Sequence, residues 1–169
     1  MSNAMSTGLL VMRLVVGFGL AAHGAQKLFG WFGGGGLEAT SVGMEHMGFR
    51  PGRRNALAAG VFEIVGGVLL GVGLLTPLAA VIVIGVMVNA AGVHLAHGFF
   101  LTKGGYEYTL SIGVVAAAIA LTTAGRWSVD NAFGLDFSAA AWGYGAIVLG
   151  LVAGVAHLST RHTEVTANA

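Results

Sequence analysis

Ionisable and amide side chains inside long apolar stretches are the residues of this sequence whose types could do chemistry. They are Arg13, His23 and Lys27 in the first stretch, Glu63 in the second, Asn89, His94 and His97 in the third, and Glu107 at the start of the fourth. A charged side chain at the centre of a membrane helix costs about 2.5–3.5 kcal/mol on insertion scales, so such a residue is by default a candidate for function. We take Glu63, His23 and Arg13 as candidate catalytic residues, and Lys27, Asn89, His94, His97 and Glu107 as candidates for a proton path or for ligand binding.

Helical periodicity predicts that several of these residues point inward together. At about 100° per residue, Arg13, His23 and Lys27 share one face of the first helix. Glu63 shares a face with three glycines, Gly60, Gly67 and Gly71, which should pack against another helix. At about 1.5 Å of rise per residue from the first loop, Glu63 lies at a depth between those of His23 and Arg13. We therefore expect a polar cluster at one end of the bundle, with a carboxylate near mid-membrane.

Structural readings of the same residues stay open. A buried pair of arginine and glutamate could lock the register of two helices, and Lys27 could reach the headgroups as an anchor. His94 and His97 are close enough for one metal ion, but the chain has no cysteine and no clear third ligand, so we predict no metal site. A histidine of the third stretch and one of the first could also ligate haem across the bundle.

The elements that carry these residues are expected to be membrane helices. Of the 169 residues, 56% are hydrophobic and 9% are charged, whereas a soluble domain carries about 25% charged residues. Five segments approach the roughly 20 apolar residues that a spanning helix needs; they run over about 7–29, 55–75, 77–97, 107–123 and 139–158. The sequence predicts an all-α integral membrane bundle with a four-helix core and a fifth, C-terminal transmembrane helix.

The loops between these segments predict how the protein is oriented in the membrane. Residues 37–49 could form a short interfacial helix, with Trp31, Phe32, Met44, Met47 and Phe49 available for the membrane boundary. With five spans, six basic residues lie on one side: Lys27, Arg50, Arg53, Arg54, Lys103 and Arg161. The positive-inside rule then makes the first and third loops cytoplasmic, in a cell membrane that we expect to be a bacterial inner membrane. A net charge of +1 excludes a nucleic-acid partner.

The domain organisation expected from these patterns is simple. Residues 1–4 look like the scar of an expression tag and are set aside from the fold. Residues 5–137 would form the four-helix membrane domain, and residues 138–169 the additional helix and a short tail.

Several motifs resemble the DoxX family. The first-helix motif is the most specific part, and the resemblance covers about residues 12–131. The motifs are RLVVG at 13–17, HGAQKLFG at 23–30, EIVGGVLL at 63–70, GLLT at 73–76, GYE at 105–107 and GRWSVD at 125–130. Two departures are Pro77, where the family often has arginine, and the fifth segment, which extends beyond the family's core.

The resemblance implies a small four-helix membrane protein associated with quinone-linked redox systems, including a subunit of thiosulfate:quinone oxidoreductase, and with membrane complexes for oxidative-stress defence. Our leading hypothesis is a quinone-interacting subunit of an oxidoreductase complex, with quinone as cofactor and haem less favoured. Because the chain lacks cysteine and a cofactor motif, a soluble or membrane redox partner would supply the electrons. The alternatives are a non-catalytic membrane scaffold for soluble redox enzymes and, less favoured, a small transporter; a homo-oligomer stays open.

Overall fold

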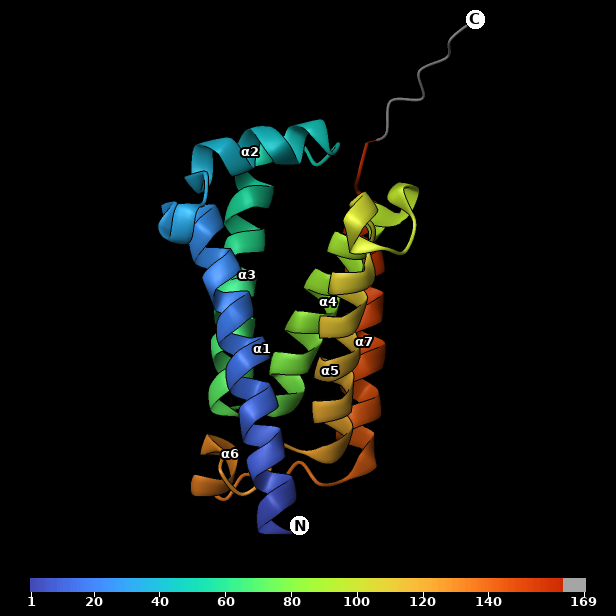
Figure 1. Cartoon of the computed structure of the whole chain (residues 1–169). Coiled ribbons are helices and arrows are strands. Elements are labelled where there is room, and N and C mark those ends of the chain that lie inside the picture. The colour runs from blue at the N-terminus through green and yellow to red at the C-terminus, as the bar shows by residue number, and fades with distance from the viewer. Residues whose placement is uncertain (163–169) are drawn as a thin grey trace, which may run out of the picture.

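The protein is a bundle of helices standing side by side (Figure 1). The computed structural model describes residues 1–162, and it has no strand within them. The long helices are α1 (Asn3–Phe29), α3 (Gly52–Val72), α4 (Thr76–His94), α5 (Glu107–Thr122) and α7 (Ala140–Leu158). Shorter elements are η1 (Trp31–Gly33), α2 (Gly36–His46), η2 (Leu95–His97), η3 (Leu101–Lys103) and α6 (Val129–Ala132).

The predicted membrane bundle is confirmed. Four segments are long and apolar enough to cross a membrane: α1, α3, α4 extended through His97, and α7. The shorter α5 is apolar as well and is the fourth predicted segment. Pro77 lies in the first turn of α4, where its missing N–H leaves no bond unmade.

The start of α1 differs from the prediction. The helix begins at Asn3, inside the segment that we set aside as a tag scar, because the Ser2 hydroxyl accepts a hydrogen bond from the Met5 N–H at 3.2 Å and caps the helix. The Asn3 side chain also accepts a hydrogen bond from Arg126 Nη1 at 2.7 Å. These residues therefore take part in the described fold.

Helices α1 and α3 approach until their backbones touch. A Cβ atom on Gly17 would lie 2.5 Å from the Gly67 carbonyl oxygen, and one on Gly67 would lie 2.4 Å from the Gly17 oxygen. Further along the helices, a Cβ on Gly24 would lie 2.5 Å from the oxygen of Gly60. The predicted inward glycine face of α3 is thus confirmed, and it faces α1. In lipid, where helices gain little from hydrophobic contact, this close van der Waals packing holds them together.

A second group of helices forms around α4. Helix α7 packs against α4 and α5, while α3 packs against α1, α2 and α4. Gly150 and Gly154 of α7 meet Ile84 and Val88 of α4, so small residues allow close packing here as well. The buried apolar core lies mainly between α4 and α5, around Val83, Met87, Ala116 and Ile119. Helix α4 is therefore the element that joins the α1–α3 pair to the rest.

Helix α2 lies across one end of the bundle (Figure 1). A short helix is present where one was predicted, and Trp31 and Phe32 before it are exposed. Its position at the membrane interface stays a prediction. Met44, Met47 and Phe49, which were also available for the boundary, line a cavity. Phe49 is only 4% exposed. The six basic residues of the topology argument lie in segments at this end, opposite the N-terminus and α6.

The glycine contact between α1 and α3 predicts a sharp difference between two glycines of one helix. A Cβ at Gly17 would collide with α3 backbone, whereas a Cβ at Gly19 would meet nothing within 4 Å. Gly17→Ala should lower the free energy of unfolding by about 1–3 kcal/mol, as overpacked sites do. Gly19→Ala should leave it unchanged or raise it by up to about 1 kcal/mol through helix propensity. Thermal unfolding in detergent measures both; equal stability of the two variants would contradict this packing.

Candidate functional site

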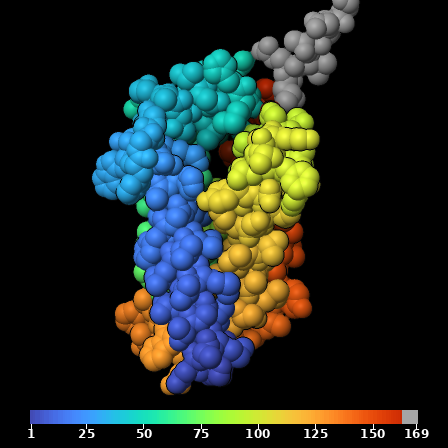
Figure 2. All heavy atoms as spheres, viewed as in Figure 1, coloured from blue at the N-terminus to red at the C-terminus, as the bar shows by residue number. Residues whose placement is uncertain are grey.

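A cavity of about 450 Å³ lies beneath α2. Figure 2 shows the molecule hollowed there, between α2 and the yellow-green segments that follow α4. Most of the wall is apolar and comes from α3, α4 and α7, while Met44, Met47 and Phe49 cover it. The polar or charged side chains of the wall are Lys27, Asn55, Glu63, Asn89, His94 and His157. A largely apolar chamber with a few convergent polar groups is the usual form of a small-molecule site.

An ion pair marks one wall of the cavity. The Lys27 ammonium donates to Glu63 Oε1, which joins the end of α1 to the middle of α3. The Glu63 side chain is 5% exposed and that of Lys27 is 32% exposed. Two N–H groups of Lys27 remain for other acceptors, because an ammonium has three donors. The pair therefore presents both a cation and an anion to a molecule in the cavity.

Two asparagines and a histidine form a polar bridge at the α2 end of the cavity. His157 Nδ1 lies 2.7 Å from Asn89 Oδ1, and His157 Nε2 lies 3.1 Å from Asn55 Oδ1. The Asn89 amide also donates to the Gly85 and Gly154 carbonyls, which orients it. The ring of Phe49 stacks on His157 with centroids 5.3 Å apart. This bridge connects α3 to α7 and, through Asn89, to α4, against which both helices pack.

The structure brings together four of the predicted site residues and separates the others. Lys27, Glu63, Asn89 and His94 line the cavity. His23 does not: it is exposed, and its Nε2 lies 3.2 Å from the Tyr108 hydroxyl on α5. The partner of Glu63 is Lys27, so the pair of Arg13 and Glu63 considered from the sequence does not form. Lys27, which could have been only an anchor at the headgroups, pairs with Glu63 and lines the cavity.

The remaining predicted residues, His97 and Glu107, belong to the loops at this same end. The His97 ring lies 6.3 Å from that of His94, centroid to centroid. His94 Nδ1 lies 2.8 Å from the Gly104 carbonyl oxygen. Glu107 accepts a hydrogen bond from the Leu101 N–H at 3.0 Å, which holds the short η3 turn. Neither His97 nor Glu107 lines the cavity.

Arg13 lies toward the opposite end and is fully buried. Its Nη2 donates to the Trp127 carbonyl oxygen at 2.6 Å, and the Asp130 carboxylate is close enough to act on it electrostatically. Asp130 in turn accepts hydrogen bonds from the Leu75 N–H and from the Thr76 N–H and hydroxyl, at 2.6, 3.0 and 2.5 Å. These contacts fasten the segment around α6 to the hairpin between α3 and α4. Arg13 Nε and Nη1 are buried without a hydrogen-bond partner among the described residues. Because Arg13 does not line the cavity beneath α2, we interpret it as a structural residue.

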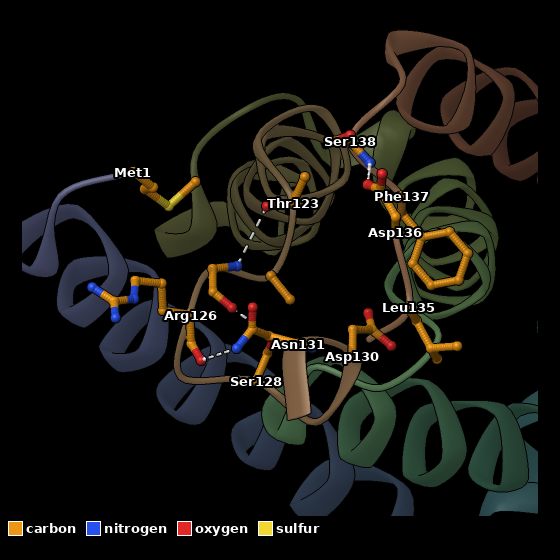
Figure 3. A pocket seen from close by; sticks show the side chains of 12 residues that line it. Met1, Thr123, Arg126, Ser128, Asp130, Asn131, Leu135, Asp136, Phe137 and Ser138 are labelled. Carbon is orange, nitrogen blue, oxygen red and sulfur yellow. Dashed lines mark hydrogen bonds between the residues drawn. The ribbon is translucent and has the colours of Figure 1, made fainter. Parts of the chain in front are cut away.

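A second, smaller cavity of about 210 Å³ lies beside α6 (Figure 3). Loop residues form its wall, and their polar groups largely bond to each other: Asn131 Nδ2 donates to the Arg126 carbonyl at 3.1 Å, and the Ser138 N–H donates to Asp136 at 2.8 Å. Hydrogen bonds from Ser138 lower the pKa of the Asp136 carboxyl from its ordinary value. Few polar groups of this wall are left to bind a ligand. We therefore favour the larger cavity as the functional site.

Metal binding finds no support in the geometry. Within residues 1–162, no group of three or more histidine, cysteine, aspartate or glutamate side chains is arranged to hold a metal ion. His94 and His97 have no third ligand beside them in that part of the chain.

Sequence reasoning overlooked Asn55 and His157. His157 interrupts an apolar segment, which is the same signal that singled out His94, so the rule could have found it. Asn55 stands at the start of a helix, where an amide is unremarkable. Its importance depends on a contact with a residue 102 positions away, and no local pattern reveals that contact.

Comparison with models of protein families matches residues 8–100 to DoxX. The match covers more than half of the 169 residues, and the chain belongs to the DoxX family. It includes α1 to α4, and therefore Lys27, Glu63, Asn55, Asn89 and His94, but it ends before α7. No curated protein and no solved structure matches the chain.

The polar bridge should control how closely α3 and α7 are held. His157→Ala leaves the Asn55 and Asn89 oxygens without this partner, and such a loss typically costs about 1–3 kcal/mol. We expect lower thermal stability and several-fold faster maleimide modification of a cysteine introduced by Ala59→Cys in the cavity wall. The chain has no native cysteine, so the label reports this position alone.

The matched control is His46→Ala, at an exposed histidine of α2 outside the cavity wall. It should leave the modification rate unchanged. If His157→Ala gave the same rate as the control, the bridge would not close the cavity.

Proposed function

We propose that this DoxX family protein binds the head group of a membrane quinone in the cavity beneath α2, and that it acts as a subunit of a membrane redox complex. The observation that carries the proposal is the Lys27–Glu63 ion pair in the wall of an otherwise apolar cavity. The membrane-spanning character of the helices supports it, because quinones dissolve in the bilayer and would reach the cavity from there.

The chemistry of the wall suits a quinone. The apolar side chains of α3 and α4 offer contact to the ring and to the first units of its tail. A Lys27 N–H that Glu63 does not use can donate to a quinone carbonyl, and this donation stabilises negative charge that develops on the oxygen during reduction. Glu63 can exchange a proton with the same oxygen.

The complete reaction needs a second protein. Reduction of a quinone to a quinol takes up two electrons and two protons. We assign the electrons to a redox-active partner, because this chain contains no cysteine and its cavity supplies acid–base groups only. The protons would pass by way of Glu63 and the polar groups at the α2 end, among them His94. The partner would dock on the end that carries α2, the end that the positive-inside rule predicts to be cytoplasmic.

The competing function is a membrane scaffold. Its support is the pattern of contacts around Arg13 and Asp130, where buried charges clearly join segments. If the Lys27–Glu63 pair does the same for α1 and α3, the cavity would carry only lipid. Both readings keep the family membership and the membrane location; they differ in what occupies the cavity.

Filling the cavity should remove the bound quinone without damaging the fold. Ala59 lines the cavity, so Ala59→Phe places an aromatic ring inside it. We expect mass spectrometry of the purified wild-type protein to find near-stoichiometric quinone. Ala59→Phe should lose at least roughly 90% of that quinone, because a blocked pocket can no longer enclose its ligand. The control Ala118→Phe adds the same ring at an exposed position of α5 and should retain quinone. Ordinary phospholipid alone in all three samples would favour the scaffold.

A second prediction concerns the proton role of Glu63. In the complex with its redox partner, Glu63→Gln should lower quinone turnover roughly 10²–10⁴-fold, the range that positioned acid–base groups contribute. Asp136→Asn, the corresponding change from carboxylate to amide at an exposed residue beside α6, should leave turnover unchanged. Unchanged turnover in Glu63→Gln, with reduced assembly or stability, would instead indicate a structural pair.

A further inference from the structure

The Glu63 carboxylate uses only one of its two oxygens within the protein. Oε1 accepts from Lys27, whereas Oε2 is buried and has no hydrogen-bond partner among the described residues. The side chain is 5% exposed, so bulk water does not reach it freely. A buried acceptor without a donor is unfavourable, and in native proteins it usually has a partner that the chain itself does not supply.

The missing partner must be a hydrogen-bond donor, and this requirement distinguishes the two redox forms of a quinone. A quinone ring carries carbonyl oxygens, which only accept hydrogen bonds, and a carbonyl gives the Glu63 carboxylate nothing to accept. A quinol carries hydroxyl groups, each with one donor and two acceptor lone pairs. One quinol hydroxyl can therefore accept from Lys27 and donate to Glu63 at the same time.

The position of the two side chains fits this double contact. Lys27 and Glu63 touch each other and both line the cavity. The terminal torsion of a glutamate is broad and roughly two-fold, so a small rotation turns either oxygen toward a ligand. Asn55, Asn89 and His157 are engaged with one another, and His94 contacts the Gly104 carbonyl through Nδ1. Among the described residues of the wall, Glu63 Oε2 is the buried side-chain acceptor that has no hydrogen-bond partner.

We propose that the cavity holds the reduced quinol more tightly than the quinone, through a hydroxyl that donates to Glu63 and accepts from Lys27. This inference rests on the proposed function and names the redox form that the same site selects. The hydroxyl keeps its proton in this contact, so no bond is formed or broken. By linkage, tighter binding of the reduced form raises the reduction potential of the bound couple. For a two-electron couple, a tenfold preference corresponds to about 30 mV.

The test compares two affinities in the same protein. A short-chain benzoquinone and its two-electron-reduced form are titrated separately into purified wild-type protein, without oxygen, and binding is measured by equilibrium dialysis. We expect the quinol to bind at least tenfold more tightly. Equal affinities would overturn this inference and leave the proposed function intact, because a water molecule would then satisfy Oε2. Binding of neither form would overturn the proposed function itself.

Two variants assign the preference to the carboxylate. Glu63→Gln replaces an oxygen acceptor by an amide N–H donor, which can serve a quinone carbonyl, so the ratio of the two affinities should fall at least tenfold. Glu38→Gln is the matched exposed control and should keep the wild-type ratio. An unchanged ratio in Glu63→Gln would overturn the assignment. If Glu63→Gln did not fold, the ratio of the two affinities in the wild-type protein would still test the proposal. Lys27→Met should then weaken the binding of both forms equally, because Lys27 donates to either one.

Discussion

The backbone contact between α1 and α3 is the constraint on which the other features of the protein depend. Gly17 and Gly67 leave no room for a side chain between the two helices, so the distance between the helix axes is small along their length. At that distance the Lys27 side chain reaches Glu63 from the end of α1. A wider separation would leave the carboxylate inside the membrane without its counter-charge, at a considerable cost.

The cavity lies where α3 and α7 pack on different sides of α4. Helix α3 packs against α1, α2 and α4, whereas α7 packs against α4 and α5. The space between α3 and α7 is therefore filled by neither helix, and it is covered by Met44, Met47 and Phe49 at the α2 end. The bridge from Asn55 through His157 to Asn89 crosses this space at one level only. The site is thus a consequence of how the two helix groups meet at α4.

The buried charges divide into two sets with different surroundings. At the α6 end, both carboxylate oxygens of Asp130 accept hydrogen bonds from the hairpin between α3 and α4, and Arg13 is enclosed by the protein. At the α2 end, Glu63 faces a cavity with one oxygen unsatisfied within residues 1–162. Arg13 also has unsatisfied atoms, because its Nε and Nη1 have no hydrogen-bond partner within residues 1–162. The two charges differ in their surroundings: Glu63 lines the larger cavity, whereas Arg13 lines neither of the two cavities. A ligand in the cavity can reach Glu63 but not Arg13, which is why we base the functional proposals on Glu63 and leave Arg13 in a structural role.

Hydropathy and helical period are local properties of the chain, so the membrane class, the five apolar helices, the short helix α2 and the glycine face of α3 could be predicted from the sequence. It also identified Glu63 as the central carboxylate. Only the tertiary structure decided that Glu63 pairs with Lys27, that His23 turns to Tyr108, and that His157 joins Asn55 across 102 residues. Partner choice depends on the rotation, tilt and spacing of whole helices, which follow from contacts distant in sequence and not from any local pattern.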